Sequence, residues 1–467
     1  MRDYNNETLS HDPIHGYITF TSAVGLEPGE VAEQQIIDHP WLQRMRQIHQ
    51  LQTAFFVYPS AEHSRFQHVL GVMYMASRAV AVLFDSLKEV CPEVPSRPYV
   101  ESLMRMAGLL HDVGHGPFGH FFDEHYLSQF DLTHETLGAI IIRDELGDQL
   151  RCIRRNPYGR LAAHERLDTD QITFLITRPG DQDRSETQPR WLYLLRSLFC
   201  GLYTVDNMDF VLRDSYTTGY NTHAFDLERL LHYSFFTSDG LTVHARGLPT
   251  LVRFLSVRAE LFRSVYFHRT VRALDLELAD LFRDGRQYVF PGDPRDHLDR
   301  YLRFTDWSLL VDGARSADSD DPNQREWGQR WRSFLAREVK WRMACERTLF
   351  FGPTDSERTS IFQNASFVEM ELRKLLPREL RDIPLRVDLA RHVHRPPTRG
   401  VTSAQNYLFD PATGQTRPLS DSELYRQLPI SYRLCRVYVQ NSTHDALLGS
   451  ALDQLIAPEG TDDKTNM

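Results

Sequence analysis

An adjacent histidine and aspartate end an apolar helical run in the stretch GLLHDVGHGPFGH, residues 108–120. Apolar side chains recur at helical spacing from Glu101 to Leu110, and the glycines and proline that follow stop the helix. His111 and Asp112 can therefore turn toward one point instead of lying apart around a helix axis. Imidazole and carboxylate groups together are a ligand set for Fe, Mn or Zn. A fold built around this feature must bring further ligands to the same place from other helices.

Helical spacing of apolar residues also dominates the rest of the N-terminal two-thirds of the chain. It predicts helices over residues 64–87, 101–110, 133–142, 192–216 and 248–282. Thr133 is placed to cap the third of these helices at its N-terminus. Polar, turn-forming residues predict loops over 181–190 and 314–324.

The pattern changes after Gly352, where short runs rich in β-branched and aromatic residues predict strands over 385–395 and 431–441. The tail from Pro458 has the composition of a disordered segment. The sequence therefore predicts a mainly α fold with three parts. These are an all-helical core over residues 1–310, a smaller α+β C-terminal lobe over 311–457 and a disordered tail over 458–467.

Composition narrows the classes of protein and partner. Hydrophobic residues make up 41% and charged residues 25%, which is typical of a globular chain. The formal net charge of −10 argues against nucleic acid as a partner, although it allows a local basic pocket for a polyphosphate. We find no run of about 18 apolar residues and no apolar signal-peptide core, so we expect no membrane partner. Five cysteines without CxxC spacing indicate free thiols and a cytoplasmic protein.

Two further candidate ligands lie on apolar helices. His68 lies in HSRFQHVLGV, and Asp206 lies in YTVDNMDFVLRD. Burying an unpaired carboxylate is costly, and a metal ion offsets that cost. Taken singly, each residue is more often a hydrogen-bonded core side chain than a ligand. Together with the His-Asp pair, they predict a metal site of His68, His111, Asp112 and Asp206.

Five motifs resemble one family, the HD-domain deoxynucleoside triphosphate triphosphohydrolases. They are DPIHG (12–16), FQHVLGV (66–72), HDVGHGPFGHFFD (111–123), LTHE (132–135) and VDNMDFVLRD (205–214). Within the family, the chain is most similar to the vertebrate type that joins a sterile alpha motif to its HD domain. The similarity covers residues 10–310 well and continues weakly through 304–310 and 426–440. It implies a stand-alone, prokaryotic enzyme without the sterile alpha motif.

The resemblance implies a reaction and a cofactor. Water attacks the α-phosphorus of a deoxynucleoside triphosphate (dNTP), and the products are a deoxynucleoside and intact inorganic triphosphate. The predicted ligands would hold a divalent transition metal (Fe, Mn or Zn), with Mg²⁺ accompanying the substrate triphosphate. The matching catalytic positions are His115, His120, Asp123 and His134. We predict that His120 is the general acid and that Asp123 orients one of the histidines. For each histidine, a structural hydrogen bond to a backbone carbonyl is the alternative.

The resemblance also implies substrate-binding positions. Arg65 and Arg258 match phosphate-side arginines, and Gln50 and Leu51 match a pair that reads the sugar 3′-hydroxyl. Asp214 would reach the sugar. Tyr266 would crowd C2′ and exclude ribose, although Arg258, Phe262 and Tyr266 at i, i+4 and i+8 would equally suit an aromatic core stripe. Three family positions differ: Asn207 replaces a lysine, Phe210 a tyrosine and Phe262 a histidine. These differences put triphosphate affinity and base preference in doubt.

The expectation that the protein is regulated rests on the resemblance alone. Asp38, Gln43 and Arg46 match positions that hold an activating guanine nucleotide in the vertebrate type, which assembles as a tetramer. We therefore expect an allosteric nucleotide and a homo-oligomer, either a dimer or a tetramer. A role in depleting dNTPs against phage is an expectation by analogy.

Two other functions are open. One is another HD phosphohydrolase, acting on cyclic or alarmone nucleotides or on single-stranded DNA ends; Gln50, Arg65 and Tyr266 argue against it. The other is a non-catalytic nucleotide sensor or scaffold. The full set of four ligands argues against that function, because a scaffold needs none of them.

Overall fold

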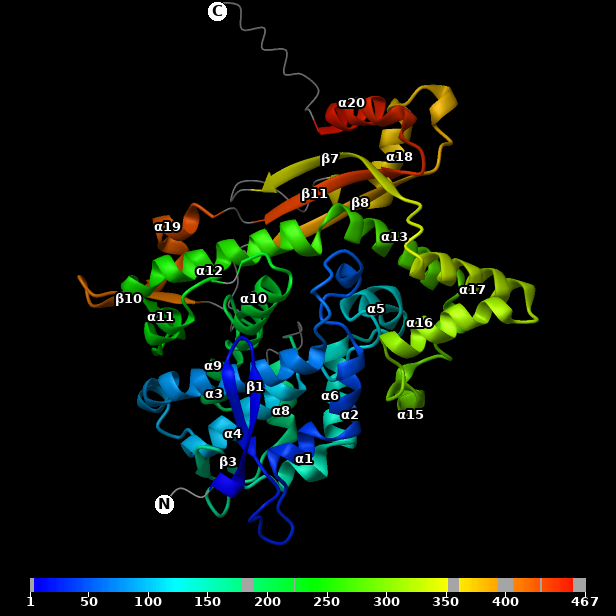
Figure 1. The fold of residues 1–467 in the computed structure, drawn as a ribbon. Helices are drawn as coiled ribbons and strands as arrows, with labels where there is room; N and C mark the ends of the chain where they lie inside the picture. Colours follow the sequence, from blue (N-terminus) through cyan, green and yellow to red (C-terminus); the bar gives the residue numbers. More distant parts are fainter. Residues whose placement is uncertain are drawn as a thin grey trace, which may run out of the picture.

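Helices build most of this molecule, and a small three-stranded sheet lies on one side of them (Figure 1). The computed structural model describes residues 4–178, 188–221, 223–351, 361–393, 406–428 and 431–456. A mainly α fold, as predicted, is therefore confirmed. Most of the predicted loop 181–190 and the predicted disordered tail 458–467 lie outside the described residues.

Five helices carry or adjoin the residues that are predicted to bind the metal or to act in catalysis. They are α3 (Arg65–Val90), α4 (Arg97–Leu110), α5 (His120–His125), α6 (His134–Asp144) and α10 (Val205–Thr217). Ser64 begins α3 with a capping box, and Thr133 caps α6 as predicted by accepting a hydrogen bond from the Thr136 backbone N–H. Gly108 lets α4 lie very close to α3, since a Cβ there would meet the Val72 carbonyl oxygen at 3.0 Å.

The remaining helices cover this centre and extend the body. They are α1 (Glu33–Ile37), α2 (Pro40–Gln43), α7 (Gly147–Arg151), α8 (Thr169–Ile176), α9 (Arg190–Arg196), α11 (Leu227–His232), α12 (Leu248–Leu261), α13 (Arg269–Asp284), α14 (Arg286–Val289), α15 (Leu298–Tyr301), α16 (Asp306–Arg315), α17 (Pro322–Leu335), α18 (Ala365–Leu375), α19 (Glu423–Arg426) and α20 (Asp445–Ile456). In Figure 1, α12 and α13 run beneath the three-stranded sheet, and α18 and α20 lie on its far side.

The strands form four small sheets within the described residues. An N-terminal hairpin pairs β1 (Glu7–Asp12) with β2 (Gly16–Thr21), and a two-residue ladder pairs β3 (Arg155–Asn156) with β4 (Gly159–Arg160). A mixed sheet has the order β10 (Gln415–Pro418), β9 (Tyr407–Asp410), β6 (Leu241–His244), β5 (Ser234–Phe236), with β6 and β9 parallel. An antiparallel sheet has the order β7 (Arg342–Phe351), β11 (Ser431–Val439), β8 (Leu385–Val393). Every residue of the central strand β11 is buried, because it has a strand on each side and helices above and below.

The hydrophobic core divides later than residue 310. One large cluster runs from Ile18 to Phe334 and takes in α16 and α17, with α16 spanning residue 310 itself. A second cluster belongs to the lobe and joins β7, β8, β11, α18 and α20. Residues of β9 and α19 pack into the first cluster although they follow β8 in the chain. The chain therefore returns to the body between β8 and β11 before it completes the sheet of the lobe.

Two predicted long helices are wrong, because each contains a break. The helix predicted over 192–216 is two helices, α9 and α10, and Thr204 caps the second by accepting from the Asn207 N–H. The helix predicted over 248–282 ends as α12 at Leu261, passes through a π-helical turn at Phe262–Tyr266 and starts again as α13. The predicted strands are confirmed as β8 and β11, and the predicted loop 314–324 shortens to the turn between α16 and α17.

Helix α3 is long and apolar enough to cross a membrane by length and composition alone. In the fold, 67% of its apolar window is buried inside the protein, and it packs against α4 and α10. A core helix satisfies the same criterion, and that is the role α3 has here.

Candidate metal centre and active site

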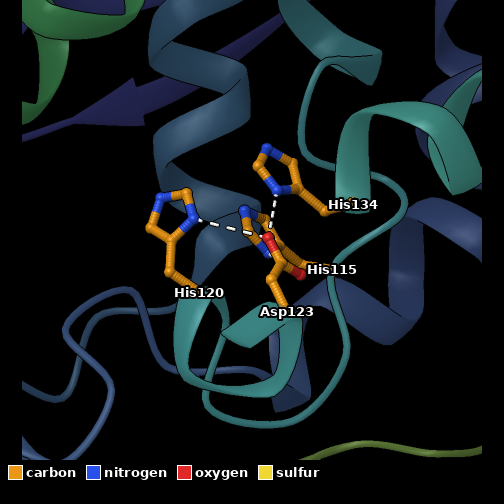
Figure 2. Close-up of side chains that lie close together, drawn as sticks. All are labelled: His115, His120, Asp123 and His134. Atoms are coloured by element: carbon orange, nitrogen blue, oxygen red, sulfur yellow. Dashed lines mark hydrogen bonds and ion pairs between the residues drawn. The ribbon is translucent and has the colours of Figure 1, made fainter. Parts of the chain in front are cut away.

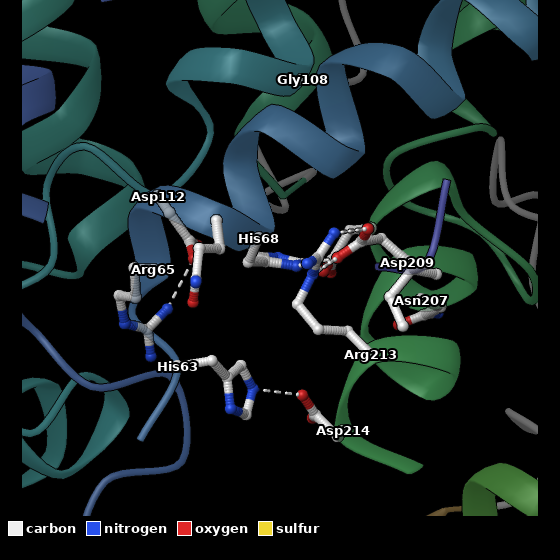
Figure 3. Close-up of polar contacts among 12 residues, drawn as sticks. His63, Arg65, His68, Gly108, Asp112, Asn207, Asp209, Arg213 and Asp214 are labelled. Atoms are coloured by element: carbon white, nitrogen blue, oxygen red, sulfur yellow. Dashed lines mark hydrogen bonds and ion pairs between the residues drawn. The ribbon is translucent and has the colours of Figure 1, made fainter. Parts of the chain in front are cut away.

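Four side chains meet where the ends of α3, α4 and α10 converge, and Figure 3 labels two of them, His68 and Asp112. His68 comes from α3, His111 and Asp112 from the end of α4, and Asp206 from the first turn of α10. Asp206 Oδ1 lies 3.1 Å from His68 Nε2 and 3.8 Å from His111 Nε2, and Asp112 Oδ1 lies 3.3 Å from His111 Nε2. The structure thus brings together the four residues predicted as ligands.

Both imidazole rings are held so that Nε2 faces this meeting point. His68 Nδ1 donates to Asp209 Oδ2 at 2.7 Å, and His111 Nδ1 donates to the Gly108 carbonyl at 2.8 Å. With Nδ1 hydrogen-bonded in this way, Nε2 is the nitrogen of each ring that is left to coordinate a metal ion. This is how metal-ligating histidines are oriented in proteins.

The charge of the cluster suits a cation. Burial lowers the pKa of His68, but hydrogen bonds to Asp206 and Asp209 outweigh it and raise that pKa to about 10. Burial also opposes ionisation of Asp112, yet its neighbours His111 and Arg65 hold its pKa well below the usual value. Two imidazole nitrogens and two carboxylates, with His68 and Asp112 buried and His111 and Asp206 partly exposed, fit a divalent transition metal such as Fe, Mn or Zn.

A second cluster places three imidazole rings around Asp123 (Figure 2). His134 Nδ1 donates to Asp123 Oδ2, and Nδ1 of His120 lies 3.6 Å from the same oxygen. The rings of His115 and His134 stack with centroids 3.7 Å apart. These four residues could hold an ion of their own, and their N–H groups equally suit phosphate oxygens.

His115 connects the two clusters. It is fully buried, and its Nε2 lies 3.4 Å from the metal-side oxygen Asp112 Oδ1. Burial, together with the charges of Arg65 and His134, lowers its pKa well below the usual value, so it is a neutral donor at neutral pH. Neither ring nitrogen has a hydrogen-bond partner among the described residues. A buried imidazole without a partner is unusual for a purely structural residue.

Two glycines of the stretch 114–119 let neighbouring groups lie very close to the backbone. A Cβ at Gly114 would meet the His134 carbonyl oxygen at 2.0 Å, and a Cβ at Gly119 would meet Arg65 Nη2 at 2.1 Å. Gly119 also has φ +56°, a left-handed conformation that favours glycine. These two positions let His134 and Arg65 reach the cavity at all.

Both clusters border one cavity of about 660 Å³. Most of the predicted substrate residues line it, namely Gln50, Leu51, Arg65, Phe210, Asp214 and Tyr266. Gln50 Oε1 has no hydrogen-bond partner among the described residues and is free to accept one from a ligand. Asp214 accepts from the Tyr266 hydroxyl at 2.5 Å, so the tyrosine ring is fixed in position.

Arg258 does not line this cavity. Its guanidinium is buried and donates to the Leu202 carbonyl at 3.0 Å. The predicted stripe of Arg258, Phe262 and Tyr266 assumed a continuous α-helix. The π-helical turn at Phe262–Tyr266 changes the register, so Phe262 and Tyr266 face the cavity while Arg258 does not.

Comparison with known proteins agrees with this geometry. Residues 65–177 match the family model described as "HD domain". This part of the chain is thus similar to an HD domain. The match includes His68, His111, Asp112 and the second cluster, whereas Asp206 lies beyond it and is placed there by the fold.

Relatives are similar over more of the chain than the HD domain. The "Deoxynucleoside triphosphate triphosphohydrolase SAMHD1 homolog" of Dictyostelium discoideum is 26% identical over 66% of this chain and 57% of its own length. Human SAMHD1 of the same description is 29% identical over 60% of this chain and 45% of its own length, and the uncharacterized YwfO of Bacillus subtilis is 28% identical over 62% and 60%. The chain thus spans about half the length of the curated relatives it matches.

A solved structure shares the fold. The crystal structure of a hypothetical protein from Aquifex aeolicus superposes with a TM-score of 0.67 at 22% sequence identity. The similarity covers 96% of this chain and 100% of that one. The fold that the two proteins share therefore includes the C-terminal lobe.

Some residues of this site were not assigned from the sequence. His63 donates from Nε2 to Asp214 Oδ1 at 2.8 Å, and Asp209 and Arg213 lie behind His68 (Figure 3). The motif VDNMDFVLRD contains both Asp209 and Arg213, and their i, i+4 spacing was the available signal. For His63 no local pattern exists, because its partner lies 151 residues away.

The residues predicted for nucleotide regulation lie on the outside of the HD domain. Arg46 Nε donates to Gln43 Oε1 at 2.8 Å, and Gln43 Nε2 donates to the Ile37 carbonyl at 2.8 Å. Asp38 is exposed at the end of α1. Their role in regulation stays a prediction.

We expect His111→Ala and Asp112→Ala to lower the transition metal bound by the folded protein to well below one ion per chain. Each variant removes a side chain that would coordinate the metal, and loss of Asp112 also leaves Arg65 without its carboxylate partner. Metal analysis of purified protein gives the stoichiometry, with the exposed His164→Ala as the matched control. Full metal content in both site variants would contradict the assignment.

Proposed function

We propose that this chain hydrolyses deoxynucleoside triphosphates to deoxynucleosides and inorganic triphosphate. One observation carries the proposal: the metal-ligand quartet and the three-histidine cluster join at His115 and border a single cavity. The same cavity holds Gln50, Asp214 and Tyr266, which suit a sugar. Relatives bearing the name of this activity are 26% and 29% identical to parts of this chain.

The residues around the quartet suit a polyphosphate. When bound, a divalent transition metal supplies Lewis-acid polarisation of a phosphoryl oxygen and lowers the pKa of a water. Arg65 donates to Asp112 through Nη1 at 2.5 Å, and its Nε has no partner among the described residues. Its remaining donors, together with His134 and the neutral His115, can therefore hold phosphate oxygens.

His120 is placed to give up a proton. The water oxygen forms a bond to the α-phosphorus while the bond from that phosphorus to O5′ breaks; O5′ takes the proton of His120, and the proton that the water loses is released to solvent. The His120 side chain is 58% exposed at the cavity, and its Nδ1 faces Asp123. Nε2 is then free to face the substrate.

Tyr266 is placed to select the sugar. Its hydroxyl is bonded to Asp214, which His63 holds from the other side. A ring fixed in this way cannot move aside for a 2′-hydroxyl. The π-helical turn that carries it is a backbone feature frequently found at functional sites.

The phosphate contacts are fewer than the family pattern provides. Asn207 and Phe210 replace cationic and hydroxyl side chains, and Arg258 faces away from the cavity. We infer that Mg²⁺ accompanies the triphosphate and supplies part of the missing positive charge. The same shortage favours, as a second candidate, hydrolysis of a nucleotide with fewer phosphates by the same centre.

The setting of the activity is also a proposal. We infer a cytoplasmic enzyme that forms dimers or tetramers and responds to a nucleotide near Asp38, Gln43 and Arg46. An enzyme that removes dNTPs limits DNA synthesis, so defence against phage is a fitting role.

A product assay tests the proposal. The full chain is incubated with Mn²⁺, Fe²⁺ or Zn²⁺ and Mg²⁺, and with each dNTP, ribonucleoside triphosphate, nucleoside monophosphate, cyclic nucleotide or single-stranded DNA in turn. We expect deoxynucleoside and triphosphate in equal amounts on chromatography. Release of pyrophosphate, or turnover only of the other substrates, would reject it.

His120→Ala should lower kcat by about 10²–10⁴-fold, the usual contribution of general acid catalysis. Substrate KM and bound metal should change little, because the acid works in the transition state. Steady-state kinetics and metal analysis on the same preparation check this. A variant that loses metal or substrate affinity instead would make His120 a binding residue.

Asp123→Asn should shift the alkaline limb of the kcat–pH profile to lower pH. Burial, His134 and Arg65 lower the pKa of His120, and the carboxylate of Asp123 opposes them. Removing its charge lowers that pKa further, so the acid loses its proton at a lower pH. The exposed Asp131→Asn is the control, and an unshifted limb would remove Asp123 from the proton path.

Tyr266→Ala should raise turnover of GTP relative to dGTP. A hydroxyl left unpaired in a closed pocket costs about 1–3 kcal/mol, or roughly 5- to 150-fold in selectivity. Tyr266→Phe separates two causes, since it keeps the ring and removes only the bond to Asp214. If both variants leave the ratio unchanged, sugar selection lies elsewhere.

A further inference from the structure

The metal-side histidine His68 rests on a carboxylate that takes no part in the proposed reaction. Asp209 is fully buried on α10, and its Oδ2 accepts from His68 Nδ1 at 2.7 Å. Arg213, one turn further along α10, donates to both oxygens of Asp209 at 2.8 and 2.9 Å. The ring that presents Nε2 to the metal is thus oriented by Asp209.

The N-terminal hairpin supplies the other partners of this carboxylate. His15 lies in the turn between β1 and β2, and its Nε2 donates to Asp209 Oδ1 at 2.6 Å. Asp12 accepts from Arg213 Nη1 at 2.8 Å through Oδ2. Its Oδ1 accepts from the backbone N–H of Ile14 and His15, which fixes the turn. Gly16 closes this turn with φ +73°.

The packing leaves this network little freedom. A Cβ at Gly71, one turn after His68 on α3, would meet Asp209 Oδ1 at 1.9 Å and Arg213 Nη2 at 2.4 Å. The side chains of Asp209, His15 and His68 are at most 1% exposed. Asp209 therefore cannot turn toward solvent if a partner is lost.

We propose that the hairpin turn Asp12–Gly16 is part of the metal centre. Asp12 and His15 are positioning residues: they act through Asp209 and Arg213 to fix the His68 ring and so set the affinity for metal. The inference rests on the metal site of the proposed function and not on its substrate.

A purely structural role explains the network less well. Burying two carboxylates with a guanidinium and two imidazoles carries a desolvation cost that apolar packing avoids. His15, His68 and Arg213 all donate to Asp209, and this carboxylate orients a predicted ligand ring. Partners of metal-ligating histidines commonly contribute 10- to 100-fold in metal affinity.

The test measures metal binding directly. The full-length protein is freed of metal and titrated with Mn²⁺ alone. We expect His15→Ala to weaken Mn²⁺ binding about 10- to 100-fold. His15→Gln should restore much of the affinity, because its amide nitrogen can donate to Asp209 as Nε2 does. His11→Ala is the matched control: it lies in the same hairpin, exposed and stacked on Tyr17.

The outcomes separate the alternatives. Unchanged Mn²⁺ affinity in folded His15→Ala, with only a lower melting temperature of the metal-free protein, would overturn the inference. If His15→Ala does not fold, Asp12→Asn decides, since it keeps the turn-forming oxygen and removes the charge opposite Arg213. Weaker Mn²⁺ binding supports the proposal, and wild-type affinity refutes it. A wild-type protein that binds no Mn²⁺, Fe²⁺ or Zn²⁺ would instead reject the metal site of the proposed function.

Discussion

The close approach of α3 and α4 at Gly108 is the contact on which the site depends. Any side chain at this position would press on the Val72 carbonyl and separate the helices. With glycine there, the rings of His68 and His111 come within 5.3 Å of each other, centroid to centroid. The Gly108 carbonyl also accepts from His111 Nδ1, so the residue that allows the approach also aims the ring. Gly108 therefore determines both how closely α3 and α4 pack and how the His111 ring is oriented.

Histidine–carboxylate pairs recur throughout this centre, and they solve a common problem. A buried carboxylate needs donors, and a buried imidazole needs its tautomer fixed. Pairing them meets both needs and leaves the second ring nitrogen with a defined role. The pairs are His68 and His15 with Asp209, His134 with Asp123, and His63 with Asp214. In the pair of His68 and Asp209, burial opposes the charged form of both groups, but their hydrogen bonds and, for Asp209, the charge of Arg213 outweigh it: the pKa of His68 is raised and that of Asp209 is held well below its usual value.

The sequence predicted the metal quartet because each ligand stands out locally. A polar residue on an apolar helix and a His-Asp pair before glycines are visible without knowing the fold. Arg258 does not line the cavity, for the opposite reason: the prediction assumed a continuous helix, and the π-helical turn leaves no sign in apolar spacing. His63 and His15 also have no local sign, since their carboxylate partners lie 151 and 194 residues away. Local sequence pattern is therefore enough to predict the ligands, whereas the residues that orient them become visible only in the folded structure.

The division at residue 310 stays a prediction, and residues on both sides of it line the same cavity. The far wall of the cavity comes from β8 of the lobe, where Asp388 pairs with Arg272 of α13 at 2.6 Å. Asp275, which Thr53 holds at 2.6 Å, is the second partner of Arg272. The lobe is therefore bound to the body at the cavity itself. Residues 65–177 supply three of the four predicted metal ligands and the histidine cluster, whereas the fourth predicted ligand and most of the walls come from the rest of the chain. The cavity therefore combines side chains that the family model matches with walls that it does not reach, and its shape is a property of the whole fold.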